Sequence, residues 1–486
     1  MTTIDFLTER DEFFIGGDWV TPTTNNRIQI ISPSTEEIAG TVPEAREADV
    51  DTAVAAARRA FDDSTGWSSW TPAQRAATLR RIADCIAADS QTIARSVSYQ
   101  NGMPISFALA AEAVAPAIFF RYFADLAENT PTEDRRAGLF GNTTVVTRRP
   151  VGVVVCIVPW NVPQAITARQ IAPALAAGCS VVLKPAPETV LDAYLLAEAA
   201  TRGGLPPGVL NVVPAGREVG VYLVSHPGID QVSFTGSSAA GREVGEACGR
   251  LLRPVTLELG GKSAAVVLED ADLGNRMESF FAATLANTGQ ICHANTRILV
   301  SRKQYGETLD MITELARSLV VGPQLEPATQ IGPLVAARQR ERVEHYIQKG
   351  RADGARITVG GGRPRGLDKG WYIEPTIFAD VDNTSTIAQE EIFGPVLCVI
   401  PYDDEDDAVR IANDSDFGLG GSVWSSDTEH AASVARRIES GTVGINGYAA
   451  DPVAPFGGVK FSGLGRSMGP EGYASHHTLK SIYLDR

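Results

Sequence analysis

The sequence predicts an α/β protein built from two α/β domains in series. Short apolar stretches rich in β-branched residues, such as Val151–Val158, have the composition of strands buried on both faces of a sheet. Segments with helical periodicity alternate with these strands, and such alternation implies right-handed crossovers within parallel sheets. The pair Gly260-Gly261 separates two alternating series, so we place the domain boundary there.

The first series opens with helices and then alternates. Helical periodicity predicts helices at Val50–Phe61, from Pro72 to about Val97, and at about Phe107–Leu126. After the strand at Val151–Val158, the expected elements are helix Ile166–Ala177 ending at Gly178, strand Ser180–Leu183, helix Asp192–Thr201, turn Gly203–Gly208, strand Gln231–Phe234, helix Ser238–Cys248 and strand Val255–Leu259. The second series comprises a strand near Ala264–Leu268, a helix near Leu273–Asn287 and a strand near Thr296–Val300.

Composition excludes several classes of protein. The chain has 486 residues, 44% hydrophobic and 21% charged, as in an ordinary globular protein. Its 43 basic and 58 acidic residues give a net charge of −15, which disfavours nucleic acid and anionic membranes as partners. The opening MTTIDFLTERDEFF has no apolar core, and Pro159, Asn161 and Pro163 interrupt the apolar stretch after Val151. We therefore expect no secretory signal, no membrane span and a cytoplasmic protein.

Six widely spaced cysteines without a CxxC pair predict neither a disulfide framework nor a metal site. Cys292 lies in the segment Thr288–Asn295, TGQICHAN, between an expected helix and an expected strand. A cysteine in such a loop can have its thiolate stabilised by backbone N–H groups, or it can be an inert small hydrophobe. His293 follows directly, but neighbours on an extended segment point to opposite faces, so we do not expect a Cys–His pair.

Three further motifs follow expected strands. Glu258 ends a strand and precedes two glycines, where a desolvated carboxylate could serve as a general base or could simply cap a turn. Asn161, in the PWNVP segment Pro159–Pro163, offers a neutral donor to an oxyanion or is an ordinary turn residue. Gly236, in the SFTGSS segment Ser233–Ser238, opens a helix whose amides could face a pyrophosphate. Without a GxGxxG pattern, an ordinary βα turn is the alternative.

These motifs occur in order with two others, KPAPE at Lys184–Glu188 and EEIFGP at Glu390–Pro395. The set PWNVP, KPAPE, FTGS, ELGGK, GQIC and EEIFGP resembles the signature set of the aldehyde dehydrogenase superfamily. The resemblance extends from about Phe14 to the closing GLGRSMGPEGY stretch, which is essentially the whole chain. It implies a non-acylating, NAD(P)-dependent oxidoreductase.

The resemblance assigns the reaction to three residues. Cys292 matches the family nucleophile, whose thiolate attacks the aldehyde carbonyl, and Asn161 with the Cys292 N–H would hold the oxyanion. Hydride would then pass to the nicotinamide and leave a thioester, which Glu258 would hydrolyse by activating water. Because non-acylating relatives keep this glutamate, we expect a free carboxylic acid. The alternatives are a CoA-acylating dehydrogenase and a non-catalytic binding protein that reuses the fold.

The resemblance also implies a dinucleotide site. Lys184 would bind the adenine ribose, Gly236 and Ser237 would face the phosphates, and Glu391 would bind the nicotinamide ribose. The full expected set is Ile157, Val158, Pro159, Trp160, Lys184, Pro187, Glu188, Gly216, Phe234, Gly236, Ser237, Leu259, Gly260, Gln339, Glu391 and Phe393. Pro187 stands where NAD-preferring relatives often carry glutamate, with Glu188 beside it, so we expect NAD with NADP as the alternative.

The expected substrate pocket matches no single subfamily. Its lining would be Val162, Ile166, Arg169, Ile291, His293 and Asp451. Arg169 matches an arginine with which semialdehyde dehydrogenases bind a carboxylate tail, but the second arginine of that clamp would fall at Ala286. A structural role for Arg169 is the alternative, and we expect a small to medium aliphatic or aromatic aldehyde.

By the same resemblance, residues 1–122 and 141–258 form a Rossmann-type NAD(P)-binding domain, and residues 259–456 form the catalytic domain. Residues 123–140 and 457–486 form a small β oligomerisation element. In it, a hairpin near 123–140 joins the strand Leu479–Leu484 across a subunit boundary. We expect a homodimer or homotetramer.

Overall fold

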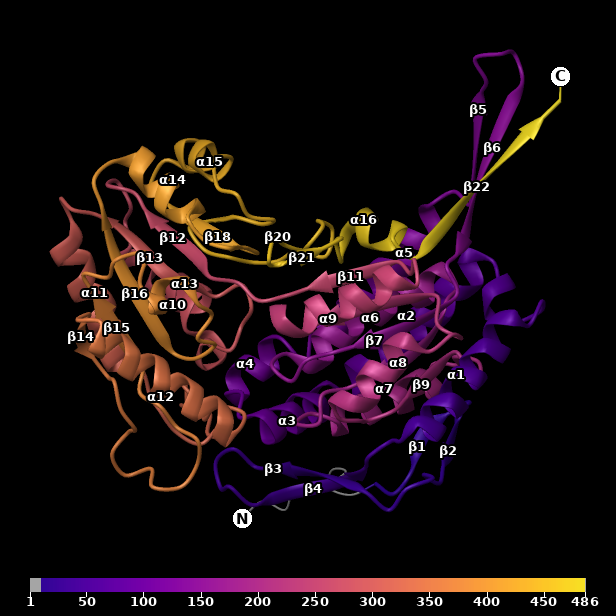
Figure 1. Cartoon of the computed structure of the whole chain (residues 1–486), viewed down its shortest axis with the longest axis horizontal. Helices are drawn as coiled ribbons and strands as arrows, with labels where there is room; N and C mark the ends of the chain where they lie inside the picture. The colour runs from indigo at the N-terminus through magenta and orange to yellow at the C-terminus, as the bar shows by residue number, and fades with distance from the viewer. Residues whose placement is uncertain (1–9, 486) are drawn as a thin grey trace.

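Two large β-sheets dominate the computed structural model, which describes residues 10–485 (Figure 1). Residues 1–9 and 486, which belong to the predicted domains and to the N-terminal segment discussed above, lie outside the described residues. The first sheet has the order β2-β1-β9-β8-β7-β10-β11-β21, in which β9, β8, β7, β10 and β11 run parallel. Its strands are β1 (Phe13–Ile15), β2 (Asp18–Val20), β7 (Val153–Ile157), β8 (Ser180–Lys184), β9 (Leu210–Val212), β10 (Gln231–Thr235), β11 (Val255–Glu258) and β21 (Gly463–Leu464).

Strand β7 is buried on both faces, as its composition predicts. Val153 and Val155 pack with helices α1, α8 and α9, whereas Val154 and Cys156 face the cluster formed by α2, α3, α5, α6 and α7. The helices are α1 (Glu47–Asp62), α2 (Pro72–Ala88), α3 (Ser90–Asn101), α5 (Ala115–Asn129), α6 (Pro163–Ala177), α7 (Leu191–Arg202), α8 (Arg217–Ser225) and α9 (Ser238–Arg250). Successive side chains alternate between the faces of a strand, so this run requires helices on both sides. The predicted α/β fold class is confirmed.

The second sheet has the order β14-β15-β16-β13-β12-β18-β19. Its strands are β12 (Ser263–Val267), β13 (Asn295–Ser301), β14 (Arg356–Val359), β15 (Thr376–Ala379), β16 (Val396–Tyr402), β18 (Gly421–Trp424) and β19 (Gly444–Ile445). Helices α10 (Met277–Thr284), α11 (Tyr305–Ser318), α12 (Ala337–Ala352), α13 (Thr386–Gln389), α14 (Glu405–Asn413) and α15 (Thr428–Ala435) accompany it. Because β11 belongs to the first sheet and β12 to the second, the chain crosses between the sheets at residues 259–262. Two small two-stranded sheets complete the structure: the hairpin of β3 (Arg27–Ile31) with β4 (Ile38–Pro43), and the long-range pair of β17 (Phe417–Gly418) with β20 (Val459–Lys460).

Three helices expected to be continuous are interrupted. Asp89 ends α2 and begins α3, so the helix expected from Pro72 to about Val97 is two helices. Turn residues 111–114 separate α4 (Ile105–Ala110) from α5, and short 3-10 turns flank α10. Apolar residues continue at helical spacing across these breaks, so periodicity alone does not reveal them.

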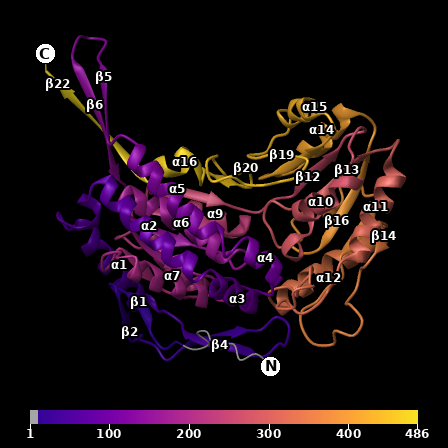
Figure 2. The same ribbon diagram turned by 180° about the vertical axis from the view of Figure 1, so that it is seen from behind.

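A third sheet, which we call the arm, has the order β22-β6-β5 and projects from the body in both views (Figure 1, Figure 2). Its strands are β5 (Glu133–Ala137), β6 (Thr143–Pro150) and β22 (His477–Leu484). Helix α5 continues to Asn129, so the hairpin lies later in the chain than residues 123–140. Within residues 457–486, β21 pairs with β11 of the first sheet, so only β22 belongs to the arm.

The C-terminal strand pairs with the hairpin of its own chain, and this pairing differs from the expected one across a subunit boundary. Strand β22 runs antiparallel to β6 along its whole length. The short helix α16 (Gly469–Ala474) ends close to β6, and the N–H of Val151 donates to the carbonyl of His476 over 2.9 Å. This contact starts β22 beside its neighbour in the same chain.

Among the described residues, one stretch, Ile105–Asn129, is long and apolar enough to cross a membrane by length and composition. Its mean hydropathy is 1.4, and half of its most apolar window is buried. The structure divides it into α4 and α5, and Phe120 and Phe123 of α5 are fully buried in the cluster shared with α2 and α6. We therefore interpret α5 as a helix of the protein core.

Arg297 on β13 gives a test of the second half of the fold. It is 2% exposed, and its guanidinium donates to the carbonyls of Lys262, Ile411 and Ala412 over 2.8–2.9 Å. We expect Arg297→Met to lower the free energy of unfolding by about 3 kcal/mol, because it leaves buried carbonyls without donors. Urea denaturation measures the change. The matched control Arg302→Met, which removes an exposed ion pair with Asp403, should cost less than about 1 kcal/mol. Equal losses of stability in the two variants would contradict a stabilising role for the buried hydrogen bonds of Arg297.

Candidate active site

A sharply turned loop presents Cys292 between α10 and β13. Asn287, Thr288 and Gly289 have positive φ angles of 51°, 58° and 71°. A Cβ on Gly289 would lie 2.2 Å from the carbonyl oxygen of Gly394, so only glycine fits there. The loop therefore turns tightly and leaves Cys292 half-buried just before β13.

Asn161 holds this loop to the first sheet. It follows β7, and its side-chain amide donates to the carbonyl of Gln290 over 2.9 Å. The backbone carbonyl of Asn161 accepts from the side chains of Asn101 (3.2 Å) and Asn287 (3.0 Å). The structure thus brings Asn161 to the cysteine loop, although 129 positions in the sequence separate it from Gln290.

Cys292 and His293 lie in contact, contrary to the expectation from sequence. Sγ of Cys292 is 4.0 Å from Nδ1 of His293, because the residues occupy a turn and not an extended segment. The imidazole stacks on the ring of Tyr448, with centroids 4.3 Å apart. Burial lowers the pKa of His293 to about 3, so the ring is neutral and a weak base at physiological pH.

Glu258 ends β11 with its side chain 4% exposed. The hydroxyl of Ser467 donates to one carboxylate oxygen over 3.3 Å, and the other oxygen has no hydrogen-bond partner among residues 10–485. Burial raises the pKa of Glu258 to about 7, opposed mainly by the charge of Arg169. The carboxylate therefore exchanges protons near neutral pH, as a general base requires.

Burial also raises the pKa of Cys292 to about 12. The charge of Arg169 acts in the opposite direction, whereas the carboxylates of Glu258 and Glu391 disfavour the thiolate further. The resting sulfur is thus a thiol at neutral pH. Any reaction through this sulfur must generate the thiolate within a site already rich in carboxylates.

A groove of about 640 Å³ lies between α8 and α9 on one face of the first sheet. Four predicted cofactor residues line it: Ile157, Lys184, Phe234 and Ser237. Ser237 caps α9 by accepting from the N–H of Ala240 over 3.3 Å. The free amides at the start of this helix suit an anion such as a phosphate.

The polypeptide around this groove places most of the remaining predicted cofactor residues. Val158 donates its N–H to the carbonyl of Lys184 over 3.2 Å, so the ends of β7 and β8 meet. Pro159 and Trp160 follow Val158, and Gly216 caps α8. Gly236 donates its N–H to the carbonyl of Glu258 over 3.1 Å. The turn after β10 therefore lies beside the end of β11, where Leu259 and Gly260 begin the crossing.

A second group of predicted cofactor residues comes from the other half. Glu391 accepts from the N–H of Gly261 over 3.1 Å, and a Cβ on Gly260 would lie 2.6 Å from its carboxylate. Phe393 has a φ of 63°, its carbonyl accepts from the side chain of Gln339 over 2.8 Å, and its ring meets that of Trp160 edge-on at 5.4 Å. This end of the site therefore exists only where the two halves meet.

Lys184, Pro187 and Glu188 lie at the end of β8 and in the loop after it. Burial lowers the pKa of Lys184 to about 8, and the charge of Glu188 opposes the shift. Glu188 forms an ion pair with Arg338, the residue before Gln339 on α12. This ion pair links the loop after β8 to the second half.

Of the six predicted pocket residues, Ile291 and His293 flank Cys292 in the chain, and the charge of Arg169 acts on its thiol. Ile166 lies in the apolar cluster against which Cys292 and Val162 pack, and Ile291 belongs to a small neighbouring cluster. Arg169 and His293 both lie against the ring of Phe456, at 4.7 and 6.1 Å. Asp451 differs: it is exposed, and its carboxylate accepts from the N–H of Val453 in its own turn.

Sequence reasoning missed several residues of the site. Ser467 contacts Glu258, Tyr448 stacks on His293, and Phe456 lies under Arg169. All three come from the C-terminal part of the chain; Ser467 lies in the closing GLGRSMGPEGY stretch, to which the sequence alone assigned no role. The groove residues Ala240, Val244 and Ala247 could have been found, because they recur at helical spacing directly after the expected phosphate turn.

Comparison with known proteins shows that the chain is similar to aldehyde dehydrogenases in sequence and in structure. The profile of the Aldehyde dehydrogenase family matches residues 19–482. Geranial dehydrogenase of Castellaniella defragrans is 53% identical over 476 residues, which cover 98% of this chain and 99% of the relative. A crystal structure of Mycobacterium tuberculosis aldehyde dehydrogenase complexed with NAD+ has a TM-score of 0.96, 49% identity, and coverage of 98% and 99%. A mutant of aldehyde dehydrogenase C from Pseudomonas syringae, in complex with NAD+ and octanal, has a TM-score of 0.93, 41% identity, and coverage of 97% and 96%.

Fold and site define an oxidoreductase built around a cysteine between two α/β halves. The chain belongs to the aldehyde dehydrogenase family. The predicted family and enzyme class are confirmed, and the expected NAD cofactor agrees with the bound state of the two structural relatives.

Proposed function

We propose that the chain oxidises an aldehyde to the free carboxylic acid with NAD+, through a thioester on Cys292. One observation carries the proposal: the buried carboxylate of Glu258 lies close enough to Cys292 to act on its thiol, and Asn161 is hydrogen-bonded to the cysteine loop. The order of events follows from what each side chain can do.

Cys292 attacks the carbonyl carbon as a thiolate and becomes part of a thiohemiacetal. The amide of Asn161 has two N–H groups, of which one is used by Gln290, and the other stabilises the oxyanion with the N–H of Cys292. NAD+, when bound in the groove, supplies the hydride acceptor. Glu258 then takes a proton from water, whose oxygen attacks the thioester and releases the acid and the thiol. A CoA-acylating enzyme would have no need of this base.

Glu258→Gln tests the hydrolytic step. We expect steady-state turnover of octanal to fall at least about 10²-fold, while one equivalent of NADH per site still forms in a burst, because only thioester hydrolysis is lost. Cys292→Ala should abolish the burst as well. Stopped-flow absorbance of NADH measures both, and the exposed Glu314→Gln is the control.

The pH dependence follows from the raised pKa of Glu258. The carboxylate is the active form, so wild-type kcat should increase as the pH rises through about 7. Full turnover in Cys292→Ala, or strict dependence on added CoA, would contradict the proposal.

NAD+ is favoured over NADP+ by the carboxylate of Glu188 near Lys184, since a fixed negative charge repels a 2′-phosphate. We expect Glu188→Ala to lower the preference for NAD+ about tenfold, measured as the ratio of kcat/KM for the two cofactors. Arg338→Met is the matched control, because it removes the partner of Glu188 and keeps the carboxylate. An unchanged ratio in Glu188→Ala would assign the preference to other residues.

An apolar aldehyde of medium length fits the cluster around Cys292 best. Ile166 and Phe456 belong to the apolar cluster against which Val162 and Cys292 pack. The relative named geranial dehydrogenase and the relative crystallised with octanal support this substrate class. We also propose a cytoplasmic location, supported by six free cysteines.

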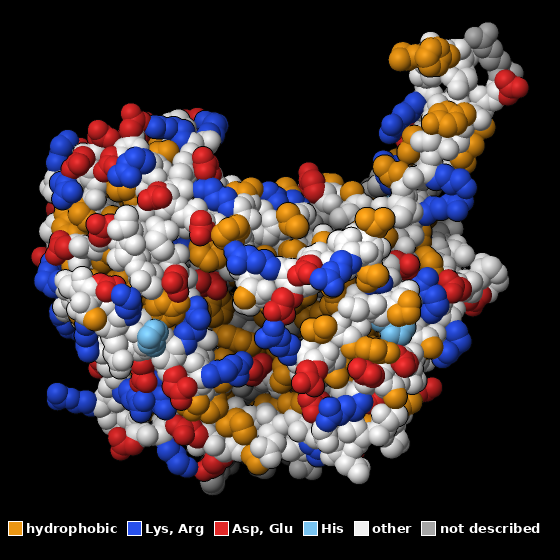
Figure 3. Space-filling model, in the orientation of Figure 1, with side chains coloured by type: hydrophobic (Ala, Val, Ile, Leu, Met, Phe, Trp, Pro, Cys, Tyr) orange, Lys and Arg blue, Asp and Glu red, His pale blue; other side chains and the backbone are white. Residues whose placement is uncertain are grey.

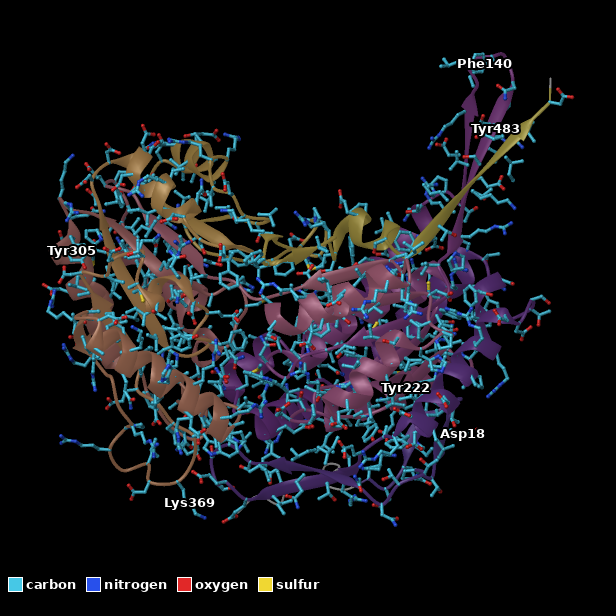
Figure 4. The ribbon with its side chains drawn as sticks, viewed as in Figure 1. Asp18, Phe140, Tyr222, Tyr305, Lys369 and Tyr483 are labelled. Atoms are coloured by element: carbon cyan, nitrogen blue, oxygen red, sulfur yellow. The ribbon has the colours of Figure 1, made fainter. Side chains whose placement is uncertain are left out.

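The arm supports the proposal that the enzyme is a homodimer or homotetramer. Phe140, at the tip of its hairpin, and Tyr483 on β22 are 86% and 74% exposed, and both lie far from the body (Figure 4). Figure 3 shows hydrophobic side chains along this projection. Exposed apolar side chains on an unsupported sheet indicate a partner surface.

Light scattering after gel filtration tests the arm. Replacing Leu139, Phe140 and Tyr483 with serine should yield monomers or smaller oligomers, because the apolar area that a partner would cover is lost. The exposed Leu252, 92% exposed on the body, serves as control when changed to serine. An unchanged mass in the arm variant would place the interface elsewhere.

A further inference from the structure

Arg169 on α6 carries a buried charge without a conventional partner. The residue is 8% exposed, and its Nε and one terminal nitrogen have no hydrogen-bond partner among the described residues. No ion pair within residues 10–485 includes it, and its guanidinium lies 4.7 Å from the centre of the Phe456 ring. A buried cation with unsatisfied donors is unfavourable for stability, so its position calls for a compensating negative charge.

The ionisable groups near Arg169 are those to which the proposed function assigns the reaction. The ring of Phe456, which Arg169 covers, lies 6.1 Å from the ring of His293, whose Nδ1 is 4.0 Å from the sulfur of Cys292. On the other side, the carbonyl of Phe456 and the carboxylate of Glu258 both accept from the hydroxyl of Ser467. Arg169 thus lies in the cluster that contains both the nucleophile and the base.

The titratable groups that face Arg169 come from three parts of the chain. They are Glu258 on β11, Cys292 and His293 before β13, and Tyr448 after β19. Arg466 acts on Glu258 and Glu391 acts on Cys292 from the surrounding segments. Arg169 is the cation that acts on both Glu258 and Cys292.

We propose that Arg169 is a positioning residue whose fixed charge stabilises the thiolate of Cys292 and the carboxylate of Glu258 in this buried site. This inference rests on the proposed function. Burial favours the thiol and the carboxylic acid, and a neighbouring cation favours the ionised forms of both. For Cys292 and for Glu258, the charge of Arg169 is the leading influence that opposes burial. Each proton leaves to solvent, and the charge left behind pairs with a guanidinium that is already in place.

Two substitutions at Arg169 distinguish the effect of its charge from the effect of its side-chain size. Arg169→Met keeps an extended side chain without charge, and Arg169→Lys keeps the charge. Iodoacetamide labelling of Cys292 at neutral pH, without substrate or cofactor and followed by peptide mass spectrometry, reports the thiolate fraction. We expect labelling at least about tenfold slower in Arg169→Met, because a rise of one unit in the pKa of the thiol lowers that fraction tenfold. Arg169→Lys should recover most of the rate.

Turnover supplies a second readout. With octanal, a neutral aldehyde, the pH of half-maximal kcat should rise in Arg169→Met and return towards the wild-type value in Arg169→Lys. Arg242→Met is the matched control, because Arg242 lies 4.4 Å over the ring of Phe461 but is exposed on α9. Its labelling rate and pH profile should equal those of the wild type.

The stability of Arg169→Met also bears on the inference. A cation without hydrogen-bond partners adds little to folding, so the melting temperature should be unchanged or higher. Equal labelling rates in Arg169→Met and wild type, a Met variant that fails to fold, or a defect confined to aldehydes with a carboxylate tail would each overturn the inference. Labelling does not depend on turnover, so it fails or succeeds separately from the Cys292→Ala test of the proposed function.

Discussion

The hydrogen bond from Asn161 to the carbonyl of Gln290 fixes the reacting centre between the two halves of the molecule. Asn161 belongs to the end of a strand in the first sheet, and Gln290 belongs to the loop that leads into the second. The carbonyl of Asn161 is held in turn by Asn101 and Asn287. The proposed oxyanion donor and the sulfur therefore keep their relative positions without rearrangement, which is the condition for electrostatic stabilisation of a transition state.

Burial sets the chemistry of this centre. Burial raises the pKa values of Cys292, Glu258 and Glu391 and lowers the pKa of Lys184, so it favours the neutral form of each group. The same low dielectric strengthens the interaction of each group with a neighbouring charge. The guanidinium of Arg169 is the leading influence that opposes burial at both Cys292 and Glu258.

The residues expected to bind the dinucleotide come from both halves of the molecule. The first half alone forms the groove between α8 and α9, next to the carboxyl ends of parallel strands, where ligands of α/β sheets usually bind. Glu391, Phe393 and Gln339 from the second half form the other end. An extended ligand in this site would contact both halves, and the ion pair between Glu188 and Arg338 already connects them.

Local composition and the order of short segments were enough to predict the α/β class, the crossing near Gly260-Gly261 and the motifs that contain Asn161, Glu258 and Cys292. Three contacts arise only in the folded chain: Cys292 touches His293, β22 pairs with β6 of the same chain, and Ser467 meets Glu258 across 209 residues. It also left two nitrogens of the buried Arg169 without a hydrogen-bond partner among the described residues. These features depend on positive φ angles, strand register and long-range packing, and residue periodicity carries no information about contacts between segments so far apart.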